Sequence, residues 1–218
     1  MSTRFTKIDD LTRGDHTFIR PEDECFHLGE YMARQGFSAG TTNDLIQNLK
    51  KPMDRRGKPE WRYKEWAIGR CADMLVESFG ASGFGAGTVV PVPPSKIVGD
   101  PAHDPRLEQI LAKASASFDA DVRPLIIQAQ NMEPSHDGER ASIKELTDNY
   151  RFNEALLTPF RKGTVFVFDD VLTTGRHFRA MKETILSRVP ETRVIGIFMA
   201  RRKIPKIDLT EIFADINL

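Results

Sequence analysis

The sequence predicts an α/β fold in which helices flank a mostly parallel, twisted sheet. Residues 165–168 are apolar without polar alternation, which is typical of a strand buried on both faces, and such strands belong mainly to parallel sheets. From residue 88 onward, strand-like segments alternate with segments of helical spacing. This alternation favours parallel strands joined by right-handed crossovers.

Composition limits the class of protein. At 218 residues, the chain suits one α/β domain or a core with a modest additional lobe. Lysine plus arginine equals aspartate plus glutamate at 31 each, so no global field favours nucleic acid or membrane and a basic ligand site must be local. The chain contains no run of about 20 apolar residues and no N-terminal signal-like segment, so we expect a cytoplasmic protein.

The cysteine content argues against a structural metal site. Cys25 and Cys71 lie far apart and form no CxxC motif. Two cysteines cannot alone supply the four ligands of a structural zinc site. They are predicted to be reduced, packed thiols.

Residues 1–84 are predicted to form a mainly helical N-terminal region, and residues 85–218 form the core domain. The first 20 residues are polar and suit a loop or a weak edge element. Pro21 with the acids after it, the polar cluster at residues 41–44 and the three- and four-residue apolar spacing that follows all favour helices. These helices are predicted over residues 21–35, 41–49 and 60–79. Four glycines in residues 80–87 mark the boundary to the core.

The core is predicted to contain strands over residues 88–92, 122–129, 164–168 and 192–199, with a last short element around residues 209–213. Asp104 before Pro105 favours a helix start with Asp104 as its cap. His103 and Arg106, at this start, lie either near a ligand or on the surface. Residues 130–162 show no continuous strand or long helix, and such long loops are usually functional lids or disordered.

Two acids end the strand at residues 164–168. Asp169 and Asp170 stand at its carboxyl end, the sheet edge where α/β proteins bind ligands. The turn that follows leads into a helix whose first amides lack partners and whose dipole favours negative charge, which makes an anion site. The alternative is a strand, a polar turn and a helix without a ligand, since Asp commonly caps helices and forms turns.

The segment VFVFDDVLTTG, residues 165–175, resembles the phosphoribosyl pyrophosphate signature of type I phosphoribosyltransferases. In that family an apolar strand ends in two acids, followed by Val-x-Thr-Thr-Gly and usually a Ser or Thr two residues later. This chain departs from the pattern at that last position, where it carries His177. The resemblance implies a type I phosphoribosyltransferase-like core with the N-terminal region as a hood. It also implies that Asp169 and Asp170 are catalytic and hold the ribose hydroxyls. The residues that would bind the 5-phosphate are Thr173, Thr174, Gly175, Arg176 and His177.

Two further segments resemble parts of the same family. PVPPSK, residues 91–96, is similar to the pyrophosphate loop of amidotransferase-type members, which implies a binding role for Pro94, Ser95 and Lys96. An ordinary Pro-rich turn is the alternative. Residues 149–155 resemble the end of the catalytic lid in the ComF-like subgroup, although the four-cysteine finger of that subgroup is missing. On such a lid, Arg140 or Arg151 would neutralise charge on departing pyrophosphate.

The resemblance implies a phosphoribosyltransferase, a glycosyltransferase of nucleotide metabolism that transfers a pentosyl group from phosphoribosyl pyrophosphate to a nitrogen nucleophile and releases pyrophosphate. Mg²⁺ would be held mainly through the ligand rather than by direct protein ligands. Two alternatives remain open: a non-catalytic module that senses phosphoribosyl pyrophosphate or a nucleotide through a protein partner, and an interaction protein with a degenerate pocket. The acceptor and a homodimeric state are also open.

Overall fold

The computed structural model describes residues 4–116, 118–132 and 141–205. Within these residues one sheet has the strand order β1-β2-β9-β8-β4-β5, and β3 extends β2 along the same side of β9. The strands from β2 to β5 in this order are mutually parallel, whereas β1 is antiparallel to β2. The predicted α/β class with a mostly parallel sheet is therefore confirmed. The strands of this sheet are β1 (Thr6–Lys7), β2 (Glu24–His27), β3 (Glu30–Tyr31), β4 (Thr88–Pro91), β5 (Asp121–Val122), β8 (Thr164–Leu172) and β9 (Arg193–Arg202).

The central strands form the core. Val165, Val167 and Phe168 of β8 are completely buried, as expected for a strand without polar alternation. On either side, β8 pairs in parallel with β4 and β9, whose residues are also largely buried. The carboxyl ends of β4 and β8 consequently lie next to each other at one edge of the sheet.

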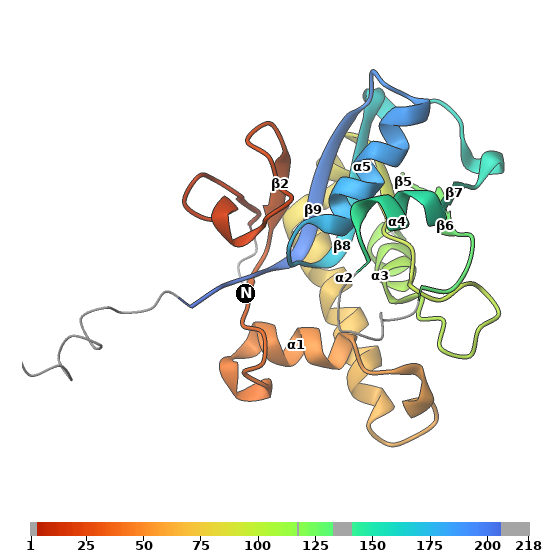
Figure 1. Ribbon diagram of the computed structural model, residues 1–218. Helices are drawn as coiled ribbons and strands as arrows, with labels where there is room; N and C mark the ends of the chain where they lie inside the picture. Colours follow the sequence, from red (N-terminus) through yellow and green to blue (C-terminus); the bar gives the residue numbers. More distant parts are fainter. Residues whose placement is uncertain (1–3, 117, 133–140, 206–218) are drawn as a thin grey trace, which may run out of the picture.

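The described helices cover both faces of the sheet. The chain passes from β4 to β5 toward one edge and from β8 to β9 toward the other, so right-handed crossovers place α3 and α5 on opposite faces. Helix α2 packs against α3, and α4 packs against α5 (Figure 1). Between β4 and β8 the connections therefore diverge, and ligands of α/β proteins bind at such switch points. The helices are α1 (Thr41–Leu49), α2 (Trp61–Phe84), α3 (Arg106–Ser115), α4 (Ile143–Asn149) and α5 (Arg176–Arg188).

The N-terminal region is mixed rather than mainly helical. The predicted helices at residues 41–49 and 60–79 are present as α1 and α2, and α2 continues to Phe84 across a break at Gly80. The helix predicted over residues 21–35 is wrong, because β2 lies there and joins the core sheet beside β9. Burial alternates along β2, with Cys25 and His27 inside. This period of two fits a strand.

The predicted strand over residues 122–129 is divided in two. Its first part, β5, belongs to the main sheet, whereas β6 (Ile126–Gln128) pairs with β7 (Tyr150–Phe152) in a separate antiparallel ribbon. Pro124 lies between the two parts and has no N–H to offer to a strand ladder. The chain therefore leaves the main sheet at this residue.

The described part of residues 130–162 is more ordered than the sequence predicted. Helix α4 begins with a capping box, in which Ser142 Oγ accepts a hydrogen bond from the Glu145 amide at 3.1 Å and Glu145 Oε2 accepts one from the Ser142 amide at 2.6 Å. This Ser-x-x-Glu pattern was present in the sequence and is a helix-start signal. The element predicted around residues 209–213 lies outside the described residues.

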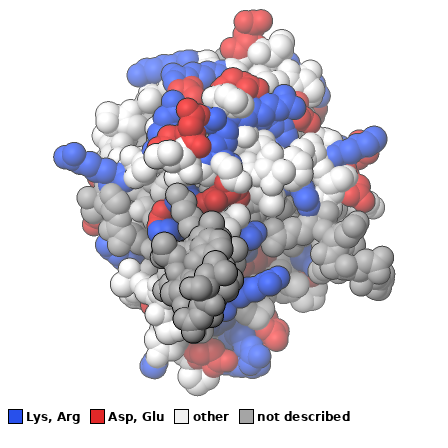
Figure 2. Space-filling view, turned by 60° about the vertical axis from the view of Figure 1, so that its left-hand side comes forward, with Lys and Arg blue, Asp and Glu red and all other residues white. Residues whose placement is uncertain are grey.

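The surface charges and the two cysteines match what the composition predicted. On the face seen in Figure 2, basic and acidic side chains are interspersed, as their equal numbers would suggest. Cys25 and Cys71 are buried and form no disulfide, and burial raises the pKa of the Cys25 thiol to about 12. In the part of the chain that is described, no helix combines the length and apolarity needed to cross a membrane.

Candidate functional site

A cavity of about 740 Å³ lies at the carboxyl ends of β4 and β8. Three sequence segments meet there: the Pro-rich loop after β4, the acid pair of β8 and the turn before α5. The predicted site residues on its wall are Pro94, Ser95, Lys96, Asp169, Asp170, Thr173, Thr174, Arg176 and His177. The structure thus brings together nine of the twelve site residues selected from the sequence.

Asp170 is a buried carboxylate held by two cations. Its side chain is 3% exposed, and its Oδ1 lies 2.9 Å from Lys50 Nζ. Its Oδ2 accepts hydrogen bonds from Arg106 Nε at 2.9 Å and from Arg106 Nη2 at 2.7 Å. Burial alone would raise the pKa of Asp170, but Lys50 and Arg106 outweigh it and hold that pKa below its usual range. Asp170 is therefore ionised, with both oxygens engaged by the protein.

Asp169 differs from its neighbour. It is half-buried on the cavity wall, and its Oδ1 accepts a hydrogen bond from the Asp170 amide at 2.8 Å. Burial, followed by the negative charge of Asp170, raises the pKa of Asp169 to about 7. Adjacent carboxyls with opposite pKa shifts are a common feature of functional sites.

A chain of charges with buried ends, Asp170 and Lys64, connects the acid pair to the N-terminal region. Arg106 Nη1 also donates to Asp104 Oδ2 at 2.9 Å, and the same oxygen accepts a hydrogen bond from Lys64 Nζ at 2.7 Å. Lys64 is 1% exposed and burial lowers its pKa, although Asp104 opposes this effect. Asp104, predicted as a helix cap, instead joins α2 to the acid pair through Arg106.

The turn before α5 requires a glycine. Gly175 has a φ of 83°, a left-handed conformation that other residues rarely adopt. A Cβ added there would lie 2.6 Å from Ile19 Cδ1, so the side chain of Ile19 leaves no room. Because α5 begins at Arg176, its first amides lack partners within the helix and face the carboxyl edge of the sheet.

Residues 16–18 hold this turn through its backbone carbonyl groups. His16 Nδ1 lies 2.5 Å from the Thr173 carbonyl oxygen, and the Phe18 amide donates to the Thr174 carbonyl oxygen at 2.8 Å. Because a carbonyl only accepts, Nδ1 of His16 carries the proton. Burial lowers the pKa of His16, and this favours the neutral ring. The two carbonyl groups of the turn are thereby fixed by the N-terminal region.

Arg176 and His177 are both tied to the segment that precedes β8. Arg176 Nη1 donates to the Ala141 carbonyl oxygen at 2.9 Å. His177 Nδ1 lies 3.2 Å from the Tyr150 hydroxyl, which is on β7. The turn predicted to bind a phosphate therefore also contacts the segment predicted to be the lid.

The loop after β4 is held at both ends. The Val92 amide donates to the Phe168 carbonyl oxygen at 2.9 Å, which joins the base of the loop to β8. The Lys96 carbonyl oxygen pairs with His103 Nδ1 at 2.7 Å, and the Ser95 carbonyl oxygen accepts from the Met132 amide at 2.8 Å. His103, left open by the sequence, thus supports the loop.

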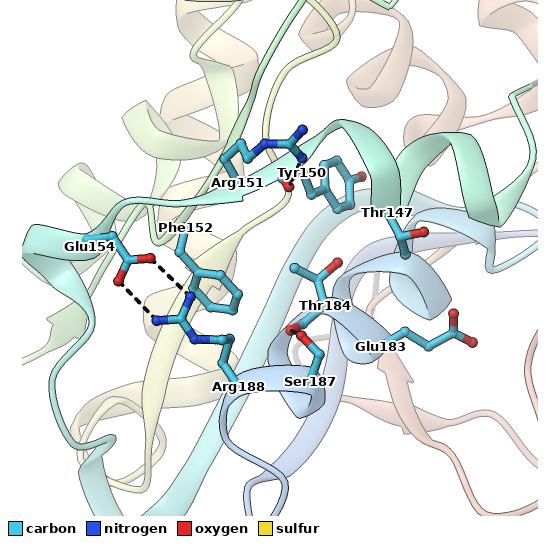
Figure 3. A pocket seen from close by; sticks show the side chains of 9 residues that line it. All are labelled: Thr147, Tyr150, Arg151, Phe152, Glu154, Glu183, Thr184, Ser187 and Arg188. Carbon is cyan, nitrogen blue, oxygen red and sulfur yellow. Dashed lines mark hydrogen bonds and ion pairs between the residues drawn. The ribbon is translucent and has the colours of Figure 1, made fainter.

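The two arginines selected for the lid have different outcomes. Arg140 lies outside the described residues. Arg151 does not line the cavity: its Nη1 donates to the Asp148 and Tyr150 carbonyl oxygens at 2.6 and 2.8 Å. It borders a separate pocket of about 520 Å³ between β7 and α5, near the Glu154–Arg188 ion pair (Figure 3). The described conformation therefore gives Arg151 no contact with the acid pair.

Comparison with protein-family models and with curated proteins found no match to this chain. The interpretation of the cavity consequently depends on its own residues and geometry.

Sequence reasoning missed Lys50 and Lys64 and left Arg106 undecided. Lys50 stood at a helix end, where cations are common, and nothing in its local sequence distinguished it. Lys64 carried a usable signal: it is spaced by 4 and 7 residues from Ile68 and Cys71 on the buried stripe of α2. A lysine on an apolar stripe requires a buried partner.

Proposed function

We propose that the cavity binds phosphoribosyl pyrophosphate and that the protein is a phosphoribosyltransferase with a type I phosphoribosyltransferase-like core. One observation carries this proposal: the acid pair, the Gly175 turn and the Pro-rich loop line one cavity at the switch point between β4 and β8. Each segment alone suits several ligands. Their convergence suits a sugar that carries a phosphate at one end and a pyrophosphate at the other.

The charges on the wall support an anionic ligand. The cations that border the cavity are Lys50, Lys96, Arg106 and Arg176, and the carboxyls are Asp104, Asp169 and Asp170. Because the raised pKa of Asp169 favours its neutral form up to about pH 7, the cations outweigh the carboxylates near neutrality. A chain without net charge therefore has a locally positive cavity.

The proposed chemistry needs positioning and electrostatics. The first amides of α5 and the hydroxyls of Thr173 and Thr174 would bind the 5-phosphate. The carboxyls of Asp169 and Asp170 would accept hydrogen bonds from the ribose hydroxyls. Their negative charge would stabilise the positive charge that develops at C1 as pyrophosphate departs. The cations on the wall would stabilise the negative charge that develops on pyrophosphate.

Magnesium suits this site through the ligand. Both oxygens of Asp170 are engaged by Lys50 and Arg106, and no group of three or more His, Cys, Asp or Glu residues able to hold a metal occurs among the described residues. Asp169 is the better available carboxylate. Mg²⁺, a hard cation, would bind chiefly to pyrophosphate and ribose oxygens and neutralise charge there.

A non-catalytic sensor is the second candidate, and the state of Asp170 favours it. An acid whose negative charge is already compensated by two protein cations stabilises a developing positive charge at C1 less well than a free carboxylate would. A module that binds the ligand and reports its presence does not need the subsequent chemistry. The two candidates share the ligand and differ in whether pyrophosphate is released.

Isothermal titration with phosphoribosyl pyrophosphate, with and without Mg²⁺, tests the ligand. We expect Arg176→Met to weaken binding by about tenfold or more, because a charged hydrogen bond contributes about 1.5–3 kcal/mol. Arg151→Met is the matched control and should leave binding unchanged, since Arg151 lies outside the cavity. Absence of binding by the folded wild-type protein in both conditions would refute the ligand. Binding without pyrophosphate release against a panel of bases and amines would favour the sensor.

A further inference from the structure

Lys50 is held in place by a buried lysine. It follows α1, and the carbonyl oxygens of its two neighbours, Leu49 and Lys51, accept hydrogen bonds from Lys64 Nζ at 2.7 and 2.9 Å. The third partner of Lys64 is Asp104 at 2.7 Å, so all three of its donors are used. The backbone on both sides of Lys50 is thereby fixed to the core.

The three cations of this network, Lys50, Lys64 and Arg106, differ in how easily their side chains can change hydrogen-bond partners. Arg106 uses Nε, Nη1 and Nη2 in bonds to Asp104 and Asp170. Lys64 is saturated and buried. The Lys50 side chain is 42% exposed, borders the cavity, and carries three donors on a flexible stem. Lys50 is therefore the cation that can change partner without leaving a buried group unpaired.

Ligand binding would weaken the contact between Lys50 and Asp170. A ribose hydroxyl that donates to Asp170 Oδ1 competes with the ammonium group 2.9 Å from that oxygen. Asp170 would keep the two hydrogen bonds from Arg106, so its charge remains compensated. The displaced ammonium group stays at the cavity wall, where the pyrophosphate brings additional negative charge.

We propose that Lys50 is a ligand-binding residue that exchanges Asp170 for the pyrophosphate group of bound phosphoribosyl pyrophosphate. This inference rests on the proposed function and adds a residue of the N-terminal region to the site. In the structure Lys50 compensates the charge of Asp170. With phosphoribosyl pyrophosphate bound, it would compensate the charge of the pyrophosphate group. Lys50 thus competes with the sugar and attracts the pyrophosphate.

Competition with the sugar and attraction of the pyrophosphate can be measured separately by comparing phosphoribosyl pyrophosphate with ribose 5-phosphate. Ribose 5-phosphate contains the sugar and the 5-phosphate without the pyrophosphate. Lys50→Met keeps the length and apolar stem of the side chain but removes its charge. Phosphoribosyl pyrophosphate should bind about tenfold to a hundredfold more weakly to this variant, as expected from loss of a charged contact. Ribose 5-phosphate should bind equally well or more tightly, because its competitor at Asp170 is gone.

Calorimetric titration of both compounds, in the presence of Mg²⁺, into wild type and three variants tests this inference. Lys50→Arg should retain phosphoribosyl pyrophosphate affinity within about threefold, since it keeps the charge. Lys51→Met is the matched control: the ammonium of Lys51 contacts Asn48 and the ring of Tyr63 rather than the acid pair, so both affinities should match wild type. A midpoint of thermal unfolding is recorded for every variant.

Each other outcome overturns the exchange. An equal loss of both affinities in Lys50→Met would assign Lys50 a purely structural role. Unchanged phosphoribosyl pyrophosphate affinity would show that its charge does not reach the ligand. In both cases wild type still binds and the proposed function stands. If folded wild type binds neither compound, the proposed function fails, and the role of Lys50 fails with it.

Discussion

Asp169→Asn should stabilise the protein at neutral and alkaline pH. The substitution keeps the size of the side chain and an oxygen that can accept the Asp170 amide hydrogen bond, so packing is unchanged. What it removes is a carboxyl whose ionised form is disfavoured by burial and by the charge of Asp170. The ionised carboxyl of Asp169 therefore lowers the free energy of unfolding, and the neutral amide of asparagine does not.

The magnitude follows from the pKa. A rise from 3.8 to about 7 corresponds to about 4 kcal/mol, since one pKa unit is about 1.36 kcal/mol. Asp169 is only half-buried and faces the cavity, so solvent screening reduces this to about 1–2 kcal/mol. The folded state binds the proton more tightly than the unfolded chain, so the cost is absent below about pH 4. It grows as pH rises and is complete above about pH 7.

The neighbouring acid provides a control of opposite sign. Lys50 and Arg106 hold the pKa of Asp170 low, so its ionised form stabilises the fold above the unfolded pKa near 4, and this contribution is lost only as pH falls through the lower folded pKa. Asp170→Asn leaves Arg106 with half of its counter-charge and should cost about 2–4 kcal/mol at pH 7. Urea unfolding at intervals from pH 4 to 8.5 measures both variants. Destabilisation by Asp169→Asn at pH 8, or a gain that does not shrink toward pH 4, would refute this reasoning.

Two other substitutions test the parts that hold the site. Gly175→Ala should cost about 1–3 kcal/mol more than Gly57→Ala in urea unfolding, because both residues have a φ near 80° but only at Gly175 must Ile19 move; equal losses would contradict the steric role of Ile19. Lys64→Met should lower stability by about 3 kcal/mol, since it leaves three oxygen acceptors without their buried donor, whereas the exposed Lys58→Met should change it by less than about 0.5 kcal/mol. A similar midpoint for these two lysine variants would show that the buried ammonium is dispensable.

The sequence predicted the features that follow from local pattern and chain order. The apolar run before Asp169 has one favourable environment, the centre of a parallel sheet, and β8 lies there with its neighbours buried. The strand continues past the predicted end at residue 168, so the acid pair lies in the last part of β8 and the Gly175 turn comes directly after it. Their position at the carboxyl edge was therefore determined once the strand was identified.

Features that depend on distant contacts were not predictable in this way. Pro21 and the acids after it favour a helix locally, yet Asp23 points inward to Arg179 and Lys182 of α5. The strand that follows gains hydrogen bonds along β9. Two ion pairs and a strand ladder outweigh a local preference of a few tenths of a kcal/mol per residue.

The charge network also crosses the boundary predicted at residue 84. Residues on both sides of this boundary contribute to the site. The N-terminal region supplies Lys50 to the acid pair, and its residues 16–18 fix two carbonyl groups of the Gly175 turn. Because Lys64 and Asp104 connect the same region to Arg106, removal of residues 1–84 would leave Asp170 with one of its two cations. Residues 85–218 therefore do not complete the site alone, and the two-cation environment of Asp170 also requires the N-terminal region.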